Sequence, residues 1–194
     1  MSKESLIHFI GNNLLAGQQS AAADLASNFS ERQLTKGEYF LKEGQLANEY
    51  LFLEEGCIRA YTTDTEGNDV TTGFYIKEQV VFEVSSFFSR TRSKENLQAL
   101  TGCKGYSLTY PQLNELFHAV PAFREFGRAM LVKGFVNLKE RTLSLINETA
   151  EERYAGLINA NPEIFQFAPL KYIASYLGVT DSSLSRIRKE FQKK

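Results

Sequence analysis

Residues 170–191 read LKYIASYLGVTDSSLSRIRKEF, and this stretch predicts two short helices joined by a tight turn. The first helix, about 170–177, places its apolar residues on one face. Gly178 follows it, at a point where a turn between helices often takes a positive φ that only glycine adopts at little cost. Thr180 then offers a hydroxyl that can cap the second helix.

The second helix, 181–191, separates apolar from polar residues. Leu184 and Ile187 lie three residues apart and therefore fall on one side, facing the first helix. The other side is polar throughout. This pattern is typical of a helix-turn-helix, whose second helix enters the major groove of DNA. An ordinary helical hairpin at the end of a domain is the alternative interpretation.

Charge favours the DNA-binding interpretation. Residues 170–194 hold six lysines and arginines against Asp181 and Glu190, a net charge of +4. The whole chain carries −1, so residues 1–169 carry −5. A cationic end on an acidic body suits a partner made of phosphates.

Side-chain chemistry suggests a role for each polar residue of this end. The guanidinium of Arg186 can bind guanine through two hydrogen bonds. Lys171, Arg188 and Lys189 suit phosphate contacts, which fix position but carry no sequence information. The predicted DNA-binding residues are Thr180, Asp181, Ser182, Ser183, Ser185, Arg186, Arg188, Lys189 and Lys171.

The bulk of the chain points to a globular protein. Of its 194 residues 43% are hydrophobic, enough to bury a core. No apolar run approaches the ~20 residues of a membrane-spanning helix, and no export signal is apparent at the start. We therefore expect a cytoplasmic protein with no membrane partner.

The cysteines and histidines are too few and too scattered for a metal site. Cys57 and Cys103 form no C-x-x-C pair, so we expect buried free thiols. A metal-dependent enzyme on a small β-barrel would need clustered histidine and carboxylate ligands. His8 and His118 are the only histidines. We expect no catalytic residues, no metal and no haem.

One or two short helices are expected within residues 3–28. From residue 31 to residue 109 the periodicity is instead that of β-strands. Short runs rich in β-branched and aromatic residues recur about every ten residues, with glycines between them. The hairpin loop Asp64–Asn68 separates two of them. This spacing predicts an antiparallel sandwich or barrel. The expected strands are 33–35, 39–41, 50–53, 57–62, 71–76, 79–82, 96–100 and 105–109.

A long helix is expected from Pro121 to about Ile146, since proline suits the first helical position. Part of its apolar series steps by four and three residues in turn, as in a coiled-coil seam. Two glycines one heptad apart would permit close approach of a second helix. The alternative is that the seam packs on the chain's own barrel. The predicted dimer-interface residues are Phe123, Gly127, Met130, Leu131, Gly134, Phe135, Leu138, Thr142 and Leu145.

The order of these elements resembles the bacterial cyclic-AMP-receptor and fumarate–nitrate-regulator (Crp/Fnr) family of transcription factors. Lys36–Phe40, then Glu43-Gly44, then Tyr50–Gly56, look like the start of its cyclic-nucleotide-binding domain. The resemblance covers nearly the whole chain. It implies a barrel that senses a small molecule, a long helix that forms a parallel homodimer, and two helix-turn-helix units that read a near-palindromic operator.

The chain departs from this family where a cyclic nucleotide would bind. The family's Phe-Gly-Glu run is Val81-Phe82-Glu83 here, and the place of its phosphate-binding arginine falls near Ser93. These departures count against binding of cyclic AMP, the cyclic nucleotide that the resemblance suggests. No cysteine lies in residues 1–56, where the oxygen-sensing branch carries its cluster.

Residues around Glu83 either line an altered effector pocket or form a solvated loop with a helix cap. The candidate pocket residues are Phe82, Glu83, Val84, Ser85, Ser86, Arg90, Arg92 and Ser93.

Together these patterns predict an α+β fold. Its parts are a cyclic-nucleotide-binding-like β-roll (jelly roll) with N-terminal helices at 1–119, a dimerisation helix at 120–147, and a winged-helix-like helix-turn-helix domain at 148–194 with the wing missing. The predicted function is that of a homodimeric transcription regulator of an operator in double-stranded DNA, with RNA polymerase as a further partner. The alternative is a cyclic-nucleotide or other ligand-binding module whose helical C-terminus binds a protein partner.

Overall fold

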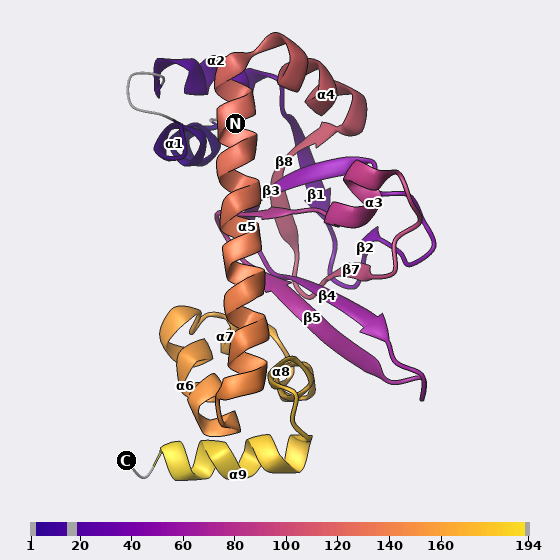
Figure 1. Cartoon of the computed structure of the whole chain (residues 1–194), viewed down its shortest axis with the longest axis vertical. Coiled ribbons are helices and arrows are strands. Elements are labelled where there is room, and N and C mark those ends of the chain that lie inside the picture. The colour runs from indigo at the N-terminus through magenta and orange to yellow at the C-terminus, as the bar shows by residue number, and fades with distance from the viewer. Residues whose placement is uncertain (1–2, 15–18, 193–194) are drawn as a thin grey trace.

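The computed structural model describes residues 3–14 and 19–192 and has the shape of a β-roll beside a long helix (Figure 1). The long helix runs from the roll to a group of C-terminal helices, and the last helix lies across the far end of the molecule (Figure 1). Lys193 and Lys194, two of the residues in the predicted cationic end, lie outside the described residues, as do Leu15 and Gly17.

The N-terminal helices form a small cap on the roll. They are α1 (Glu4–Asn12), the 3-10 turn η1 (Gln19–Ala21) and α2 (Ala22–Ser27). Leu6 and Ile10 of α1 are fully buried. The Lys3 ammonium donates to the carbonyls of Ala26 and Phe29, so it satisfies backbone groups left open where α2 ends.

Two four-stranded sheets form the roll, as the strand spacing predicted. One sheet has the order β1-β8-β3-β6 and the other β2-β7-β4-β5, with every neighbouring pair antiparallel. The strands are β1 (Ser30–Leu34), β2 (Tyr39–Leu41), β3 (Glu49–Glu55), β4 (Ile58–Thr63), β5 (Asp69–Tyr75), β6 (Gln79–Val81), β7 (Asn96–Ala99) and β8 (Cys103–Thr109).

The core is one continuous cluster that includes residues of both sheets and of the N-terminal helices. Phe52, Leu53, Leu97 and Leu108 are fully shielded from solvent in it, and the Phe52 ring lies 4.8 Å from that of Phe9 in α1, measured between centroids. At Gly105 the chain approaches β3 so closely that a Cβ would lie 2.1 Å from the Phe52 carbonyl oxygen, so only glycine fits. The roll is therefore packed tightly at its centre.

The predicted hairpin loop between β4 and β5 is also confirmed. The Asp64 carboxylate accepts hydrogen bonds from the backbone N–H groups of Glu66 at 2.9 Å and Asn68 at 2.8 Å. These donors, the Asn68 N–H first among them, lower the pKa of Asp64. Gly67 supplies the positive φ of the turn, +86°.

Helices fill the rest of the chain. They are α3 (Val84–Ser89), α4 (Tyr110–Ala119), α5 (Pro121–Asn147), α6 (Ala150–Ala160), α7 (Ile164–Phe167), α8 (Leu170–Leu177) and α9 (Asp181–Phe191). Thr109 with Gln112 and Thr149 with Glu152 form capping boxes that begin α4 and α6. The one-turn helix α7 leads into the helix-turn-helix.

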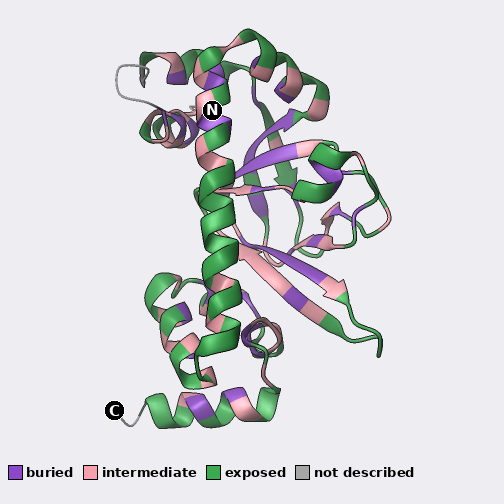
Figure 2. Ribbon diagram, viewed as in Figure 1, coloured by how far each residue is buried: buried purple, intermediate pink, exposed green. Residues whose placement is uncertain are grey.

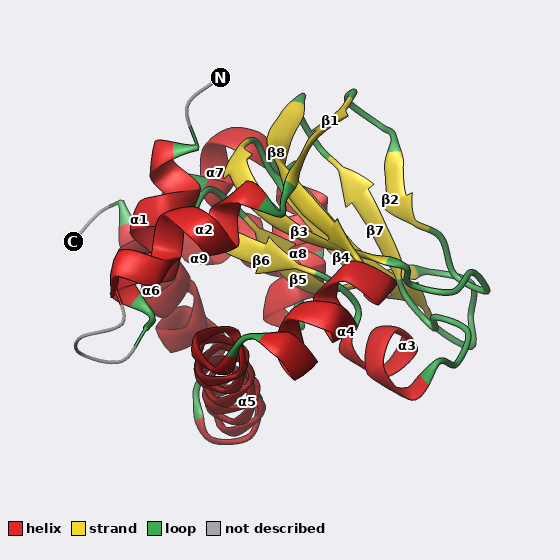
Figure 3. Ribbon diagram, turned by 90° about the horizontal axis from the view of Figure 1, so that it is seen from above, coloured by secondary structure: helices red, strands yellow, loops and turns green. Residues whose placement is uncertain are grey.

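The helix α5 has two different environments along its 27 residues, about 40 Å. Near the roll, Phe123, Phe126 and Gly127 are buried in the same core as the sheets. Residues 131–140 are all exposed, and α5 turns from purple and pink to green along its length (Figure 2). Seen along its axis, α5 stands at the edge of the molecule, with no other described element beyond it (Figure 3).

This burial corrects two of the predicted dimer contacts. Phe123 is 1% exposed and packs on Phe117 and Phe126 of its own chain, so it is not free to meet a second chain. At Gly127 a Cβ would lie 2.4 Å from the Phe117 ring, so α4 and not a second helix requires the glycine. The apolar periodicity of α5 alone does not show whether a residue packs on α4 or on the helix of a second chain. At Gly134 a Cβ would meet nothing within 4 Å.

Alanine substitutions at the two glycines should therefore have different effects on the free energy of unfolding. Gly127→Ala is expected to destabilise the chain by about 1–2 kcal/mol, because overpacking against Phe117 outweighs the ~1 kcal/mol gain in helix propensity. Gly134→Ala should not destabilise it, since open space surrounds that position. Denaturant titration of both variants measures the difference, and equal effects would show that α5 does not approach α4 as described.

Both cysteines are buried and free, as expected. Cys57 and Cys103 lie close together, with the Cys103 thiol 3.5 Å from the Cys57 carbonyl oxygen. Burial raises the pKa of the Cys57 thiol to about 12 and also raises that of Cys103, so both stay protonated near neutral pH. Among the described residues no helix is both long enough and apolar enough to cross a membrane.

Candidate nucleic-acid interface

The turn between α8 and α9 has the geometry that the sequence predicted. Gly178 adopts the left-handed conformation, with φ +69° and ψ +35°. The N–H of Val179 donates to the Ala174 carbonyl at 3.0 Å, which closes the end of α8. Thr180 caps α9 by accepting from the Ser183 N–H at 3.2 Å.

One apolar cluster holds the two helices together. Ile173, Ala174 and Leu177 of α8 and Leu184 and Ile187 of α9 are all buried in it. The cluster also includes Tyr154 and Leu157 of α6 and Ile164 of α7. The face of α9 opposite this cluster is consequently turned outward at the far end of the molecule (Figures 1 and 2).

The outward face carries most of the predicted DNA-binding residues. Asp181, Ser182, Ser185, Arg186 and Lys189 are exposed, whereas Ser183 and Arg188 are half-buried. Within residues 3–14 and 19–192 the side chains of Arg186 and Lys189 form no ion pair. These two cations are therefore free to meet a partner.

The two remaining predicted residues are Thr180 and Lys171. Thr180 is exposed, but its hydroxyl lies 3.0 Å from those of Ser182 and Ser183, so these three side chains already form a small network that begins α9. Lys171 is exposed at the start of α8, with its ammonium 5.0 Å from the centre of the Tyr172 ring.

Two arginines that sequence reasoning missed fix the end of α8. Arg141 of α5 donates to the Tyr176 carbonyl at 3.0 Å, and Arg153 of α6 donates to the Leu177 carbonyl at 3.0 Å. These carbonyls lie in the last turn of a helix and have no partner within it. The sequence offers no separate signal for them, because arginines on helices usually face solvent.

The exposed part of α5 carries a long apolar stripe. Exposed fractions are 41% for Leu131, 70% for Phe135, 62% for Leu138 and 45% for Leu145. Gly134 and Thr142 are exposed in the same series, and Met130 is half-buried against the roll. Side chains of this size rarely stand open to water in such number along one helix.

The predicted effector residues divide into two groups. In the first, Glu83 caps α3, accepting from the N–H groups of Ser85 at 3.0 Å and Ser86 at 2.6 Å. The buried Ser86 hydroxyl accepts from the Ala47 N–H at 2.8 Å. Ser93 is buried as well, and its hydroxyl donates to the Glu95 carbonyl. The helix-cap interpretation therefore accounts for Glu83, and Val84 is an exposed residue of α3.

The second group consists of Arg90 and Arg92, which line an open cleft of about 650 Å³. Glu83 and the loop 44–49 line the same cleft. Arg90 donates to the Ala47 carbonyl at 2.8 Å and to the Asn48 side chain at 2.7 Å, and Arg92 donates to the Gly44 carbonyl at 2.8 Å. Both arginines are thus anchored to this loop.

Phe82 takes no part in the cleft. Its ring packs 5.2 Å from that of Tyr50, 5.8 Å from Phe87 and 5.9 Å from Phe88, measured between centroids. The cavity between this aromatic cluster and α5 has only about 10 Å³, less room than one water molecule needs. An aromatic side chain therefore fills the position where the family motif has glycine.

Comparison with known proteins gives the same architecture. Residues 31–119 match the family described as cyclic nucleotide-binding domain. The fumarate and nitrate reduction regulatory protein of Yersinia pestis is 26% identical over 184 residues, covering 88% of this chain and 72% of the relative.

Solved structures of other proteins share the fold. FixK2 from Bradyrhizobium japonicum superposes with a TM-score of 0.71 at 19% identity and covers 85% of each chain. The cyclic di-GMP-responsive global regulator CLP of Xanthomonas campestris superposes with a TM-score of 0.69 at 15% identity, covering 90% of this chain and 91% of that one.

Proposed function

The chain belongs to the Crp/Fnr family of DNA-binding transcription regulators, and on this premise we propose that it acts as a homodimer on an operator in double-stranded DNA. Its relatives are regulators and not enzymes. We assign residues 1–119 to the sensor roll, 120–147 to the dimerisation helix and 148–194 to the DNA-binding domain. Residues 121–127 belong structurally to the roll, because their apolar side chains complete its core.

One observation carries the proposal, namely that the chain combines an exposed apolar stripe on α5 with an exposed cationic face on α9. Phe135 and Leu138 in the middle of the stripe are 70% and 62% exposed, and α9 turns Arg186 and Lys189 outward at the end to which α5 leads. Two copies joined along α5 would place two recognition helices at one end. The family geometry then spaces them one turn of DNA apart, ~34 Å, so that each meets a successive major groove.

A small effector in the roll is the second part of the proposal. The cleft of Arg90 and Arg92 supplies guanidinium groups for an anionic molecule. One structural relative is described as responsive to cyclic di-GMP, an anionic nucleotide. We place the effector in this cleft, because it has room for a small molecule, whereas the cavity beside Phe82 has about 10 Å³. Contact with RNA polymerase and a cytoplasmic location complete the proposed function.

A DNA-binding assay at varied salt distinguishes this proposal from a protein-binding C-terminus. Lys171, Arg188 and Lys189 of two protomers would neutralise about six phosphates, so log K should fall against log salt with a slope of about −5. Affinity for a random duplex should drop roughly 1000-fold between 50 and 200 mM salt. Fluorescence anisotropy with a labelled duplex measures both. A dimer that shows no binding at 50 mM salt would favour the protein-partner alternative.

A further inference from the structure

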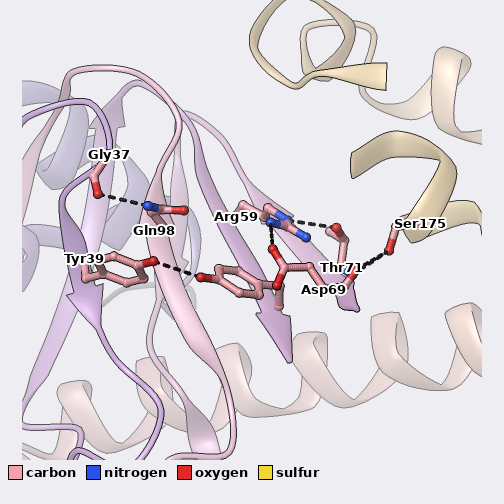
Figure 4. Close-up of polar contacts among 8 residues, drawn as sticks. Gly37, Tyr39, Arg59, Asp69, Thr71, Gln98 and Ser175 are labelled. Atoms are coloured by element: carbon pink, nitrogen blue, oxygen red, sulfur yellow. Dashed lines mark hydrogen bonds and ion pairs between the residues drawn. The ribbon is translucent and has the colours of Figure 1, made fainter. Parts of the chain in front are cut away.

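The helix-turn-helix unit is attached to the roll by direct contacts as well as through α5. The Ser175 hydroxyl of α8 accepts from the backbone N–H of Thr71 in β5 at 2.9 Å, and it donates to the Asp69 carbonyl at 3.3 Å (Figure 4). Next to this pair, the rings of Phe74 in β5 and Tyr176 in α8 lie 5.4 Å apart between centroids. The first helix of the unit therefore rests on the β4–β5 hairpin.

Arg59 of β4 is the centre of this contact. Its side chain is 1% exposed, although it carries a full positive charge. Nη1 lies 3.1 Å from the Asp69 carboxylate, and Nε donates to the Thr71 hydroxyl at 2.9 Å (Figure 4). Asp69 and Thr71 belong to β5, so the polar contacts of Arg59 stay within the hairpin.

The flat faces of the guanidinium meet one aromatic ring from each domain. The guanidinium carbon lies 4.2 Å from the centroid of Tyr61 in the roll and 3.7 Å from that of Tyr172 in α8. Tyr61 is held in turn by a 3.0 Å hydrogen bond between its hydroxyl and that of Tyr39. A cation–π pair is strongest when it is shielded from water, as it is here.

The hydrogen bonds of Arg59 compensate only in part for burying its charge. The Nη2 atom of Arg59 is buried and has no hydrogen-bond partner among the described residues. A buried charge is costly unless its surroundings compensate for it, and a planar guanidinium stacks well in only one orientation. If α8 moved, Arg59 would lose the Tyr172 ring and regain water. The contact consequently favours one defined position of α8 over a range of positions.

A second arginine contacts the same helix from α5. Arg141 of α5 lies 3.7 Å from the centroid of the Tyr176 ring and donates to the Tyr176 carbonyl. Tyr172 and Tyr176 are one helical turn apart. The helix α8 is therefore fixed from the roll and from α5 at once, and α9 follows α8 because the two share a buried apolar cluster.

We propose that Arg59 is a positioning residue that fixes the recognition helix relative to the roll and thereby sets which half-site spacing the regulator accepts. The claim about half-site spacing rests on the proposed function, whereas the claim about the orientation of α9 does not. Arg59 touches no DNA in this account and acts only through Tyr172 and Ser175.

A distance measurement within one protomer tests the orientation directly. Nitroxide labels on Glu115→Cys in α4 and Glu190→Cys in α9 would report the distance between roll and recognition helix. Both positions are exposed, and the native thiols are buried. Labelled chain is diluted with unlabelled chain so that only distances within a protomer are read. We expect one narrow distance distribution in the parent and at least a twofold broader one with Arg59→Met, which keeps an unbranched side chain but removes the charge.

Variants on the opposite side of the contact provide the controls. Tyr172→Leu should broaden the distribution as Arg59→Met does, and it remains informative if Arg59→Met fails to fold. Tyr172→Phe keeps the ring and should match the parent. A narrow, unshifted distribution in Arg59→Met and Tyr172→Leu would overturn the assignment of Arg59.

Operators with altered spacing test the consequence for DNA. The parent should prefer its best spacing by about tenfold or more over operators lengthened or shortened by 2 base pairs, and Arg59→Met should reduce that preference to about threefold or less. Affinity for a single half-site should be unchanged, which separates positioning from a general loss of stability. An unchanged spacing preference would overturn the proposal. If the parent binds no DNA, the proposed function fails and the distance measurement alone decides the role of Arg59.

Discussion

A chain carrying Phe135→Asp and Leu138→Asp is expected to fold like the parent but to remain monomeric. In the single chain these side chains are 70% and 62% exposed, so replacing them removes little buried surface. In the proposed dimer they lie in the apolar seam, where four carboxylates would lose water and repel one another. Operator affinity should fall by 100-fold or more, because the two half-sites would be bound independently.

Light scattering and operator titration measure this effect together. A matched control is Lys133→Gln with Asn137→Asp, which changes the net charge by the same amount on exposed positions outside the predicted seam. That control should dimerise normally. A double variant that still dimerises, or a parent that is monomeric at high concentration, would show that the stripe on α5 has another purpose.

The second large effect is expected at α9. Arg186→Ala should weaken binding to the operator by ~1–3 kcal/mol and relax the preference for one base pair, because a bidentate contact to guanine would be lost. Lys189→Ala should instead weaken operator and random DNA alike and reduce the salt slope by about one for each contact removed. Both side chains are exposed and free of ion pairs in the described chain, so neither change should unfold the domain.

Titrations of both variants against operator and random duplexes separate the two roles. The informative quantity is the ratio of specific to non-specific affinity, measured at one salt concentration. If Arg186→Ala lowers both affinities equally, Arg186 contacts phosphate and another residue reads the base.

Local patterns were strong enough to predict the elements of the fold. Apolar spacing and Gly178 located the turn between α8 and α9, and the regular recurrence of short strands gave the two sheets. The long helix followed from Pro121 and an apolar series, and the structure confirms it over Pro121–Asn147. The surface of that helix was harder to assign. Phe123 and Leu131 look alike in sequence, but the first packs on the roll and the second is exposed.

The contacts between segments that are far apart in the sequence could not be predicted from it. The strand expected at 57–62 contains Arg59, whose surroundings come from β5 and from a helix more than 100 residues later. A charged residue next to Ile58 and Ala60, with Asp69 across the hairpin, was the available signal. Nothing in the spacing pointed to Tyr172. The altered Phe82 was visible in the sequence, but only the structure shows that its ring fills the space.

Selection of bound duplexes from a random pool tests the central claim most directly. If two recognition helices are held on paired α5 helices, the enriched sequences should contain an inverted repeat whose half-site centres lie ~34 Å apart, about one turn of DNA, or a whole number of turns. Enrichment of a single unpaired motif, or no enrichment at low salt, would contradict a homodimeric operator-binding protein.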